Sequence, residues 1–429
     1  MSDTIFAVAT AGGRAGVAVV RISGDRAHLI ADQLAGPGLI PRQPSLRTLR
    51  NPDGEPLDDA LVLLFNEGAS FTGEAVTEFH THGSPAVISA VLDELSRCEN
   101  TRLATPGEFT RRALENGCLD LAQVEGLSDL IEAETEAQRV QALSMMQGGL
   151  SELAERWRID LIRAMALITA TIDFADEDVP VDVTLEVREL ISRTQTSIAQ
   201  ELDGFGASER IREGFEVAMI GRPNSGKSTL INALAGRDAA IVSDVAGTTR
   251  DVIEVRMDVA GLPVTFLDTA GLRKTEDKVE AIGVARAVTR AEAADLRIFL
   301  LETGQKSPDP ELARGDEDLV VVGKSDLGEG DISGVTGEGL SELLEQIGDV
   351  LRTRAGRAGS VTRRRQRDVL STALSGLESG MNQVERGSEW VDLAAEDLRY
   401  TVQMLDTLVG RVDVEDILDE VFSSFCLGK

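Results

Sequence analysis

The sequence predicts a multidomain protein of α/β and α class, with an α+β amino-terminal domain and a helical domain into which a doubly wound α/β domain is inserted. Strand-like runs and helices are mixed between residues 4 and 118. Apolar residues recur at helical spacing over 119–211 and 361–425, whereas strands alternate with helices over 215–350. We therefore expect an amino-terminal domain at 1–118, an α/β domain at 212–350, and a helical domain made of 119–211 and 351–429.

The elements of the amino-terminal domain are predicted from short apolar runs and turn residues. Gly12 and Gly13 are placed to turn the chain between the first two runs. Thr105, Pro106 and Glu108 form the pattern of a capping box with proline at the first helical position, which predicts a helix over 105–115. The other expected elements are strands at 5–9, 17–22, 60–65 and 75–82, and a helix at 87–95.

Helical periodicity is the main signal over residues 119–211. One apolar face is formed by Leu150, Leu153, Trp157, Leu161 and Met165. An acidic stretch at 173–180 ends one helix, and it is either a solvated loop or a cation site. An α/β region between two helical stretches indicates an insertion into one helical domain.

Composition excludes several classes of protein. Because 42% of the 429 residues are hydrophobic but only 3% are aromatic, the cores must consist mainly of aliphatic side chains, which favours helices and parallel strands. No apolar run reaches the roughly 18 residues of a membrane span, and the amino terminus lacks the basic region of a signal peptide. With three scattered cysteines and three histidines, neither a disulfide framework nor a zinc site is expected. We expect a cytoplasmic protein that binds no membrane.

The net charge of −30 predicts that the chain as a whole repels RNA. A role with nucleic acid therefore needs a local basic patch or a basic partner protein. One arginine cluster is such a patch, with a solvated linker and helix start as the alternative. Its members are Arg352, Arg354, Arg357, Arg363, Arg364, Arg365 and Arg367.

A phosphate-binding loop is predicted at 221–229. It matches G-x-x-x-x-G-K-[ST] between an apolar strand-like run at 215–220 and a helical pattern that starts near Leu230. Glycines let backbone N–H groups surround a phosphate, the helix amino terminus adds a positive field, and Lys227 adds a charge. The expected contacts are Asn224, Ser225, Gly226, Lys227, Ser228 and Thr229.

Three further motifs follow this loop in the order typical of a GTPase. Asp268 ends a strand-like run, where it can reach Mg²⁺ through water, and the N–H of Gly271 can meet the γ-phosphate. A threonine within 247–251 can join Ser228 on Mg²⁺. Asp326 follows a third strand-like run and can accept both N–H donors of guanine. Together these motifs predict a Ras-like GTPase domain with contacts from Asp268, Thr269, Ala270, Gly271, Lys324 and Asp326.

Two positions depart from the usual GTPase pattern. The guanine motif normally reads Asn-Lys-x-Asp, but Gly323 stands at the Asn position. A side-chain contact is lost there, so we expect weaker nucleotide affinity with the guanine preference retained. Leu272 stands where Ras-like GTPases carry a water-positioning Gln. The group that orients water, and the charge of an arginine finger, must therefore come from elsewhere.

These motifs together resemble the MnmE (TrmE) family of tRNA-modification GTPases, and the resemblance spans the full chain. The terminal motifs separate this family from other GTPases. The resemblance is carried by Asn224, Gly247–Asp251, Asp268–Leu272, Phe425–Lys429, Gly16–Gly24, Phe71–Glu74 and Leu119–Gln123.

The resemblance implies that K⁺ supplies the charge of an arginine finger. It also implies that the nucleotide domains of two subunits meet across their switch regions. Glu280 matches the family's catalytic glutamate, which orients or activates water; an exposed helix acid is the alternative. The implied K⁺ ligands are Asn224, Ser243, Val245 and Thr248.

The resemblance also implies the remaining nucleotide contacts. Ser228 and Thr249 match the Mg²⁺ ligands, and Ser333 and Gly334 match the loop that backs the guanine. The first switch segment would contribute Ser243, Asp244, Val245, Ala246, Gly247, Thr248 and Thr249.

The family's amino-terminal domain binds 5,10-methylene- or 5-formyl-tetrahydrofolate and forms a homodimer. An acid can pair with pterin N–H donors, and cations can hold carboxylates. Cys118 stands where the family usually has Lys, and Arg111 or Arg112 could compensate. Cys426 matches a cysteine needed for modification but not for GTP hydrolysis, with a small buried residue as the alternative. The matching folate positions are Arg21, Glu78, Cys118 and Lys429.

The family acts with the FAD-carrying flavoprotein MnmG, in a heterotetramer, on C5 of the wobble uridine of certain tRNAs. It attaches aminomethyl or carboxymethylaminomethyl groups, the folate donates the one-carbon unit, and GTP turnover drives conformational change. A basic partner protein that makes most of the tRNA contacts would explain how an acidic chain can act on tRNA. A ribosome-assembly or RNA-binding switch GTPase shares the central motifs but needs no folate domain. A folate-dependent methyltransferase is a third reading, but nothing in 1–118 resembles its own nucleophile or metal site.

Overall fold

The computed structural model describes residues 3–173, 183–222, 224–237, 254–268, 289–305, 315–412, 422 and 428. It divides into two compact units. The first consists of Met1–Ser128 and Asp406–Lys429, and the second of Asp129–Leu405. Both chain ends therefore belong to the same unit. No helix among the described residues combines the length and apolar character that crossing a membrane requires.

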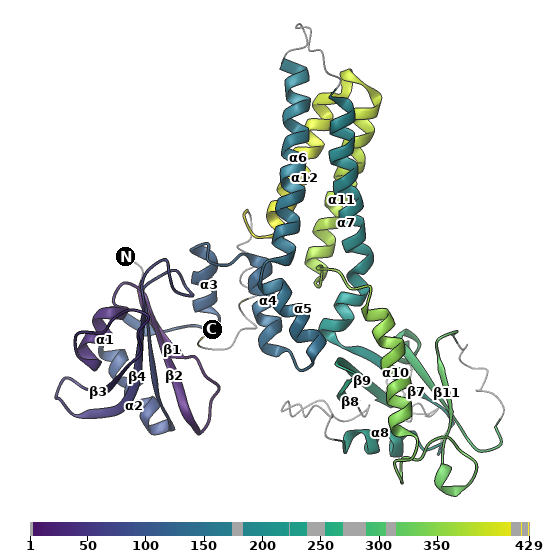
Figure 1. Ribbon diagram of the computed structural model, residues 1–429, viewed down its shortest axis with the longest axis horizontal. Coiled ribbons are helices and arrows are strands. Elements are labelled where there is room, and N and C mark those ends of the chain that lie inside the picture. Colours follow the sequence, from purple (N-terminus) through teal and green to yellow (C-terminus); the bar gives the residue numbers. More distant parts are fainter. Residues whose placement is uncertain are drawn as a thin grey trace, which may run out of the picture. The chain divides into compact units, whose positions relative to one another are not determined.

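A six-stranded sheet forms the centre of the first unit (Figure 1), in the order β3-β4-β5-β2-β1-β6. Neighbouring strands are antiparallel except β1 and β6, which are parallel. Side chains alternate along β4, so that Ala60, Val62 and Leu64 are buried while the residues between them lie on the other face. The strands are β1 Thr4–Val8, β2 Ala15–Ser23, β3 Ser45–Arg50, β4 Pro56–Phe65, β5 Val76–Gly83 and β6 Thr101–Leu103.

Helices α1 (Ala27–Ala35) and α2 (Pro85–Arg97) cover one face of this sheet and complete its core. The opposite face of β2 and β5 carries the charged residues considered below. Helix α3 (Glu108–Glu115) begins three residues later than predicted, because Gly107, with φ of 72°, is its N-cap. Thr105 still donates its N–H to the Glu108 carboxylate, at 2.9 Å. The capping contact is present, but it closes the loop before the helix.

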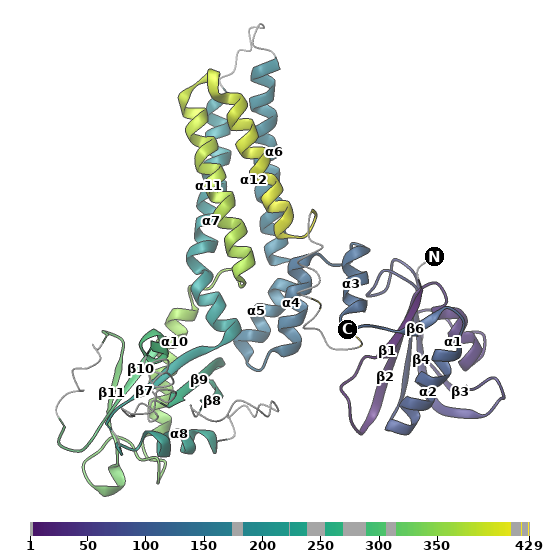
Figure 2. The same ribbon diagram turned by 180° about the vertical axis from the view of Figure 1, so that it is seen from behind.

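The second unit contains long helices on both sides of the α/β region in sequence. Helices α7 and α11 pack side by side, although the whole α/β region separates them in the chain (Figures 1 and 2). Helix α6 packs on α7 as well. This confirms that the α/β domain is inserted into a helical domain. The helices are α5 Glu136–Met146, α6 Gly149–Asp173, α7 Thr184–Glu213, α11 Arg364–Arg386 and α12 Val391–Leu408, and α4 (Leu121–Glu132) precedes them.

The α/β region is built on a five-stranded sheet in the order β11-β10-β7-β9-β8. All neighbours are parallel except β8, which runs antiparallel to β9 at one edge. Parallel strands buried on both faces explain the continuous apolar runs that predicted them. The elements are β7 Phe215–Ile220, α8 Lys227–Ala235, β8 Glu254–Val259, β9 Leu262–Asp268, β10 Leu296–Leu301, β11 Leu319–Val322 and α10 Leu340–Ala355.

Candidate functional site

The predicted phosphate loop joins β7 to α8 and lies at the carboxyl end of the parallel strands. Two of its residues need unusual backbone geometry: Asn224 has φ of 67° and Gly226, the N-cap of α8, has φ of 107°. At Gly221 a Cβ atom would stand 2.5 Å from the carbonyl oxygen of Leu300, so the close approach of β10 requires glycine. The motif's glycines therefore serve backbone curvature and packing, as the pattern predicted.

Lys227 lies over this loop. Its ammonium donates to the carbonyl oxygens of Gly221, at 2.8 Å, and Arg222, at 2.9 Å. Burial lowers the pKa of Lys227, and the nearby charge of Asp268 partly opposes that shift. The ammonium is thus held at the mouth of the loop, where a phosphate would meet it.

Ser228 and Asp268 meet at the first turn of α8. The Ser228 hydroxyl donates to Asp268 Oδ2 at 2.7 Å, and Asp268 is buried at the end of β9. Hydroxyl and carboxylate oxygens suit Mg²⁺, which takes few protein ligands and completes its shell with phosphate and water. The described residues contain no group of three or more His, Cys, Asp or Glu side chains placed to hold a metal.

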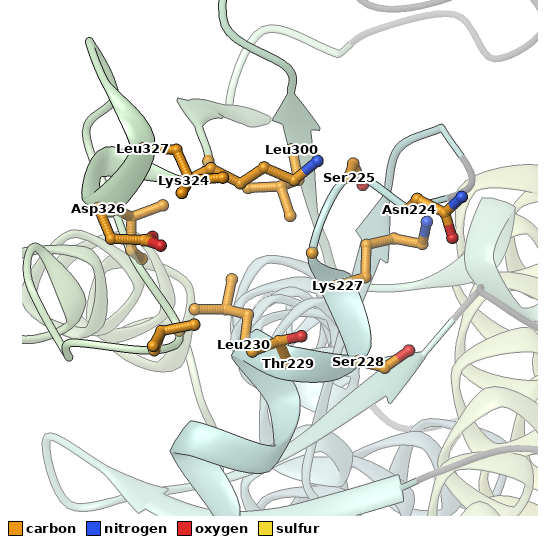
Figure 3. Close-up of a pocket in the computed structure, with 15 residues that line it drawn as sticks. Asn224, Ser225, Lys227, Ser228, Thr229, Leu230, Leu300, Lys324, Asp326 and Leu327 are labelled. Atoms are coloured by element: carbon orange, nitrogen blue, oxygen red, sulfur yellow. The ribbon is translucent and has the colours of Figure 1, made fainter.

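The guanine motif faces the phosphate loop across a pocket of about 480 Å³ (Figure 3). Asp326 and Lys324 line one side of the pocket, while Asn224 and Lys227 line the other. Four sequence-predicted groups, from two separate motifs, are therefore brought to one cavity. Its lining includes every predicted residue from Asn224 to Thr229.

Ser333 fixes the orientation of Asp326. Its hydroxyl accepts the N–H groups of Val335, at 3.1 Å, and Thr336, at 3.2 Å. The hydroxyl hydrogen is therefore directed to Asp326 Oδ1, 2.6 Å away. Gly334 passes so close to α8 that a Cβ atom would stand 2.9 Å from the backbone of Thr229.

Gly323 is closely packed. A Cβ atom there would lie 3.1 Å from both the Ser225 carbonyl oxygen and a Leu300 methyl group. The glycine thus lets the end of β11 approach the phosphate loop directly. Lys324, which follows it with φ of 64°, lies 3.4 Å from Glu302. Glu302 was not predicted from the sequence, because it belongs to no motif.

In the first unit, the structure brings together Arg21 and Glu78, two of the predicted folate residues. They are cross-strand partners on β2 and β5, and Arg21 Nε lies 3.0 Å from Glu78 Oε1. The Arg21 guanidinium also lies near the aromatic rings of Phe71, at 5.6 Å, and Phe109, at 5.8 Å. This face of the sheet therefore combines a carboxylate, a guanidinium and an exposed aromatic ring.

Arg112 forms ion pairs that hold segments of the first unit together. This buried residue pairs with Glu74 at 3.0 Å, with Asp3 at 2.9 Å and with Glu108 at 3.2 Å. The Arg111 guanidinium lies 5.1 Å from the centre of the Phe422 ring. Neither arginine is placed in contact with Arg21 or Glu78 by any of these interactions.

Cys118 is exposed and lies against the Phe71–Glu74 motif, which precedes β5. A Cβ atom on Gly73 would stand 2.9 Å from the Cys118 sulfur. The Asn116 amide also donates to the carbonyl oxygen of Thr72, at 2.7 Å. The segment after α3 thus packs against the loop before β5.

Several predicted site residues lie outside the described part of the chain. They are Ser243, Asp244, Val245, Ala246, Gly247, Thr248, Thr249, Thr269, Ala270, Gly271, Glu280, Cys426 and Lys429. The acidic stretch lies largely there too. Of the carboxyl-terminal motif, Gly428 is described and lies against Val8 and Ala9 at the end of β1.

The arginine cluster is largely neutralised by neighbouring acids. Surface ion pairs of this kind leave little field to attract a polyanion. They join Arg352 to Asp349, Arg354 to Glu317, Arg363 to Asp129, Arg364 to Glu209 and Arg367 to Asp368.

Comparison with known proteins bears on these sites. Residues 121–426 match the family model of the MnmE helical domain, and residues 4–118 match that of the GTP-binding protein TrmE N-terminus. The tRNA modification GTPase MnmE of Cereibacter sphaeroides is 59% identical over 431 residues, covering 100% of both chains. That of Roseobacter denitrificans is 55% identical over 432 residues, again covering 100% of both.

Solved structures match parts of the chain. Era of Aquifex aeolicus bound to GDP and AlF4⁻ is 24% identical with a TM-score of 0.26, covering 38% of this chain and 66% of that one. The FeoB G-domain of Methanococcus jannaschii is 23% identical with a TM-score of 0.24, covering 32% and 98%. The full-length relatives and the two family models decide the assignment: the chain belongs to the MnmE family of tRNA modification GTPases.

Proposed function

We propose that this chain is a GTP hydrolase that acts in modifying the wobble uridine of certain tRNAs. The observation that carries the proposal is the pocket in which the phosphate loop and Asp326 face each other. Asp326 accepts the two N–H donors of guanine, while the loop amides and Lys227 hold the phosphates. Such a site accounts for a substrate that is both a guanine nucleotide and a polyphosphate.

Mg²⁺ is proposed to bind at Ser228 and Thr249, with Asp268 reaching it through water. The ion neutralises charge on the phosphates when it is bound. The 2.7 Å contact between Ser228 and Asp268 supports this assignment, since it places a hydroxyl and a carboxylate beside the loop. Glu280, by family resemblance, would orient the attacking water that Leu272 cannot.

K⁺ is proposed to replace an arginine finger. Asn224 supports this, because its positive φ places it on the exposed side of the loop, at the pocket. Ser243, Val245 and Thr248 would complete the ion's ligands by family resemblance. In a homodimer, the nucleotide domains of the two subunits would meet across their switch regions and so complete the K⁺ site.

The K⁺ role is tested by measuring GTP hydrolysis in KCl and in NaCl at equal ionic strength. We expect hydrolysis to be at least about tenfold faster in K⁺, because a finger charge stabilises the transition state. Asn224→Ala should remove this difference while GTP binding, measured separately, persists. Equal rates in both salts for the wild-type chain would contradict the K⁺ role.

The first unit is proposed to bind 5,10-methylene- or 5-formyl-tetrahydrofolate as the one-carbon donor. The Arg21–Glu78 pair supports this, since a carboxylate can accept pterin N–H groups and a guanidinium can hold a carboxylate. Lys429 and Cys118 are further candidates for contacts, and Cys426 for a role in modification. The folate residues would belong to a domain at 1–118. The other proposed domains are a GTPase domain at 212–350 and a helical domain made of 119–211 and 351–429.

A flavoprotein partner, MnmG, is proposed to carry FAD and most of the tRNA contacts. The net charge of −30 and the paired arginines support this division of labour. The assembly would be a heterotetramer in the cytoplasm, where GTP turnover drives a conformational change.

A further inference from the structure

His80 extends the Arg21–Glu78 pair on the open face of the amino-terminal sheet. It follows Glu78 by two residues on β5, so both side chains point to the same face. Its Nε2 lies 3.3 Å from Glu78 Oε2, while Arg21 Nε lies 3.0 Å from Oε1. Each carboxylate oxygen therefore has its own donor.

The chemistry of the carboxylate fixes the direction of these contacts. An ionised carboxylate only accepts hydrogen bonds, so His80 Nε2 must carry the hydrogen. His80 is the cross-strand partner of Leu61 on β4 and of Val19 on β2, so its strand is paired on both sides at this position. Glu78 is consequently held from two sides, and its side chain is only 15% exposed.

Two donors leave acceptor capacity on Glu78. A carboxylate offers about four lone-pair positions, two on each oxygen. With one used by Arg21 and one by His80, each oxygen keeps a further position. Two adjacent N–H donors on one ligand edge, as a pterin offers at N3 and its 2-amino group, could occupy both.

We propose that His80 is a positioning residue of the folate site, holding Glu78 in the orientation that accepts the pterin edge. This inference rests on the proposed folate function of the first unit. Its basis is that the two carboxylate oxygens of Glu78 are contacted from different sides. Arg21 contacts Oε1, and among the contacts that the structure describes only His80 contacts Oε2. Without the His80 contact, Glu78 is hydrogen-bonded through one oxygen only. Ligand binding must then fix the orientation of the carboxylate, which lowers the affinity.

The test measures binding of 5-formyltetrahydrofolate to the full chain by calorimetry. His80→Ala should weaken binding about five- to tenfold, the range expected for one hydrogen bond to a charged group in a partly exposed site. His80→Gln keeps an N–H donor at similar reach and should bind within about twofold of the wild type.

His82→Gln is the matched control. His82 lies on the same strand and face, but it pairs with Asp58 at 2.7 Å instead of Glu78. Its replacement should leave binding unchanged, and thermal unfolding should show that all variants remain folded.

The outcomes separate the two claims. A wild-type chain that does not bind 5-formyltetrahydrofolate would overturn the ligand assignment, and the role of His80 with it. If the wild type binds, unchanged affinity in His80→Ala would overturn only the positioning role. Equal weakening in His80→Ala and His80→Gln would also overturn it, because a general structural role predicts no rescue by the donor.

Discussion

At the scale of single residues, the guanine site depends on a serine whose hydrogen has one available direction. Ser333 is 1% exposed and accepts two backbone N–H groups, so its own hydrogen goes to Asp326. Asp326 is itself exposed and would rotate without this bond. The buried serine therefore preorganises the group that reads the base.

Ser333→Ala should lower GTP and GDP affinity about tenfold. The physical reason is loss of one hydrogen bond to a charged acceptor, together with two N–H groups left without their acceptor. Titration with a fluorescent guanine nucleotide measures the effect. Ser341→Ala is the control, because that hydroxyl makes only an exposed 3.3 Å contact with Arg237. Wild-type affinity in Ser333→Ala would show that Asp326 needs no such support.

Glu108 links stability of the first unit to pH. Burial alone would raise its pKa, but contacts with Arg102, Thr105 and Arg112 outweigh burial and lower the pKa from 4.5 to about 2. A depressed folded-state pKa contributes stability above the unfolded-state value of 4.5. That contribution is lost as the pH falls from 4.5 toward 2.

Glu108→Gln should therefore lower the urea midpoint at pH 6 more than at pH 3. The amide cannot attract the two arginines at any pH, so the variant loses part of the acid sensitivity. Glu99→Gln serves as the control, because Glu99 is 77% exposed where it pairs with Arg26. Equal destabilisation by Glu108→Gln at both pH values would rule out this electrostatic account.

At this scale, the sequence predicts a site residue where a motif fixes both residue type and spacing. The loop residues and Asp326 could be predicted in this way, and the structure brings them to one pocket. Glu302 and His80 were not found, since each acts through a neighbour that only the folded chain supplies. His80 carried one weak signal, its period-two spacing from Glu78 in a predicted strand.

At the scale of elements, the described residues that follow α12 pack against amino-terminal segments of the first unit. Val409 accepts the N–H of Leu121 at 3.1 Å, and Phe422 is buried against Val124. Gly428 has φ of 90°, and a Cβ atom there would collide with the Val8 carbonyl oxygen. Val8 is paired with Val20, next to Arg21, so Gly428 contacts the strand that neighbours the one carrying this folate candidate.

Gly428→Ala should reduce tRNA modification severely while GTP hydrolysis stays near the wild-type rate. The added methyl group would collide with the Val8 carbonyl oxygen and displace residue 428 from β1, whereas it lies on none of the residues that line the nucleotide pocket. Modification is measured in cells that carry the variant as their only copy. Gly117→Ala is the matched control, because Gly117 also has positive φ but has nothing within 4 Å of its Cβ position. Full modification with Gly428→Ala would contradict this role of the terminal contact.

Several elements were not predicted from the sequence, among them helix α1 and strands β3, β6 and β8. Strand β6 has three residues, too few for an alternating pattern, and β3 is an edge strand with two arginines. Strand β8 begins at Glu254, three residues after the motif at 247–251. It pairs with β9 in an antiparallel hairpin whose two-residue turn, Ala260 and Gly261, has positive φ at both positions.

At the scale of the whole molecule, the chain combines a nucleotide pocket and a folate candidate in different units. The α/β insertion could be predicted because the periodicity changes twice along the chain. The packing of α7 on α11 could not be predicted, because a helical pattern shows which face of a helix is apolar but not which other helix packs on that face. The strong negative charge and the paired arginines are the basis of our proposal that most tRNA contacts lie on a partner protein.

The central claim is that GTP turnover at this pocket serves wobble-uridine modification. Mass spectrometry of tRNA nucleosides from cells lacking this protein tests it most directly. We predict loss of the aminomethyl and carboxymethylaminomethyl groups at C5, restored by the wild-type chain but not by Lys227→Ala, which cannot hold the phosphates. Unchanged nucleosides in the deletion strain, or full restoration by Lys227→Ala, would contradict the account.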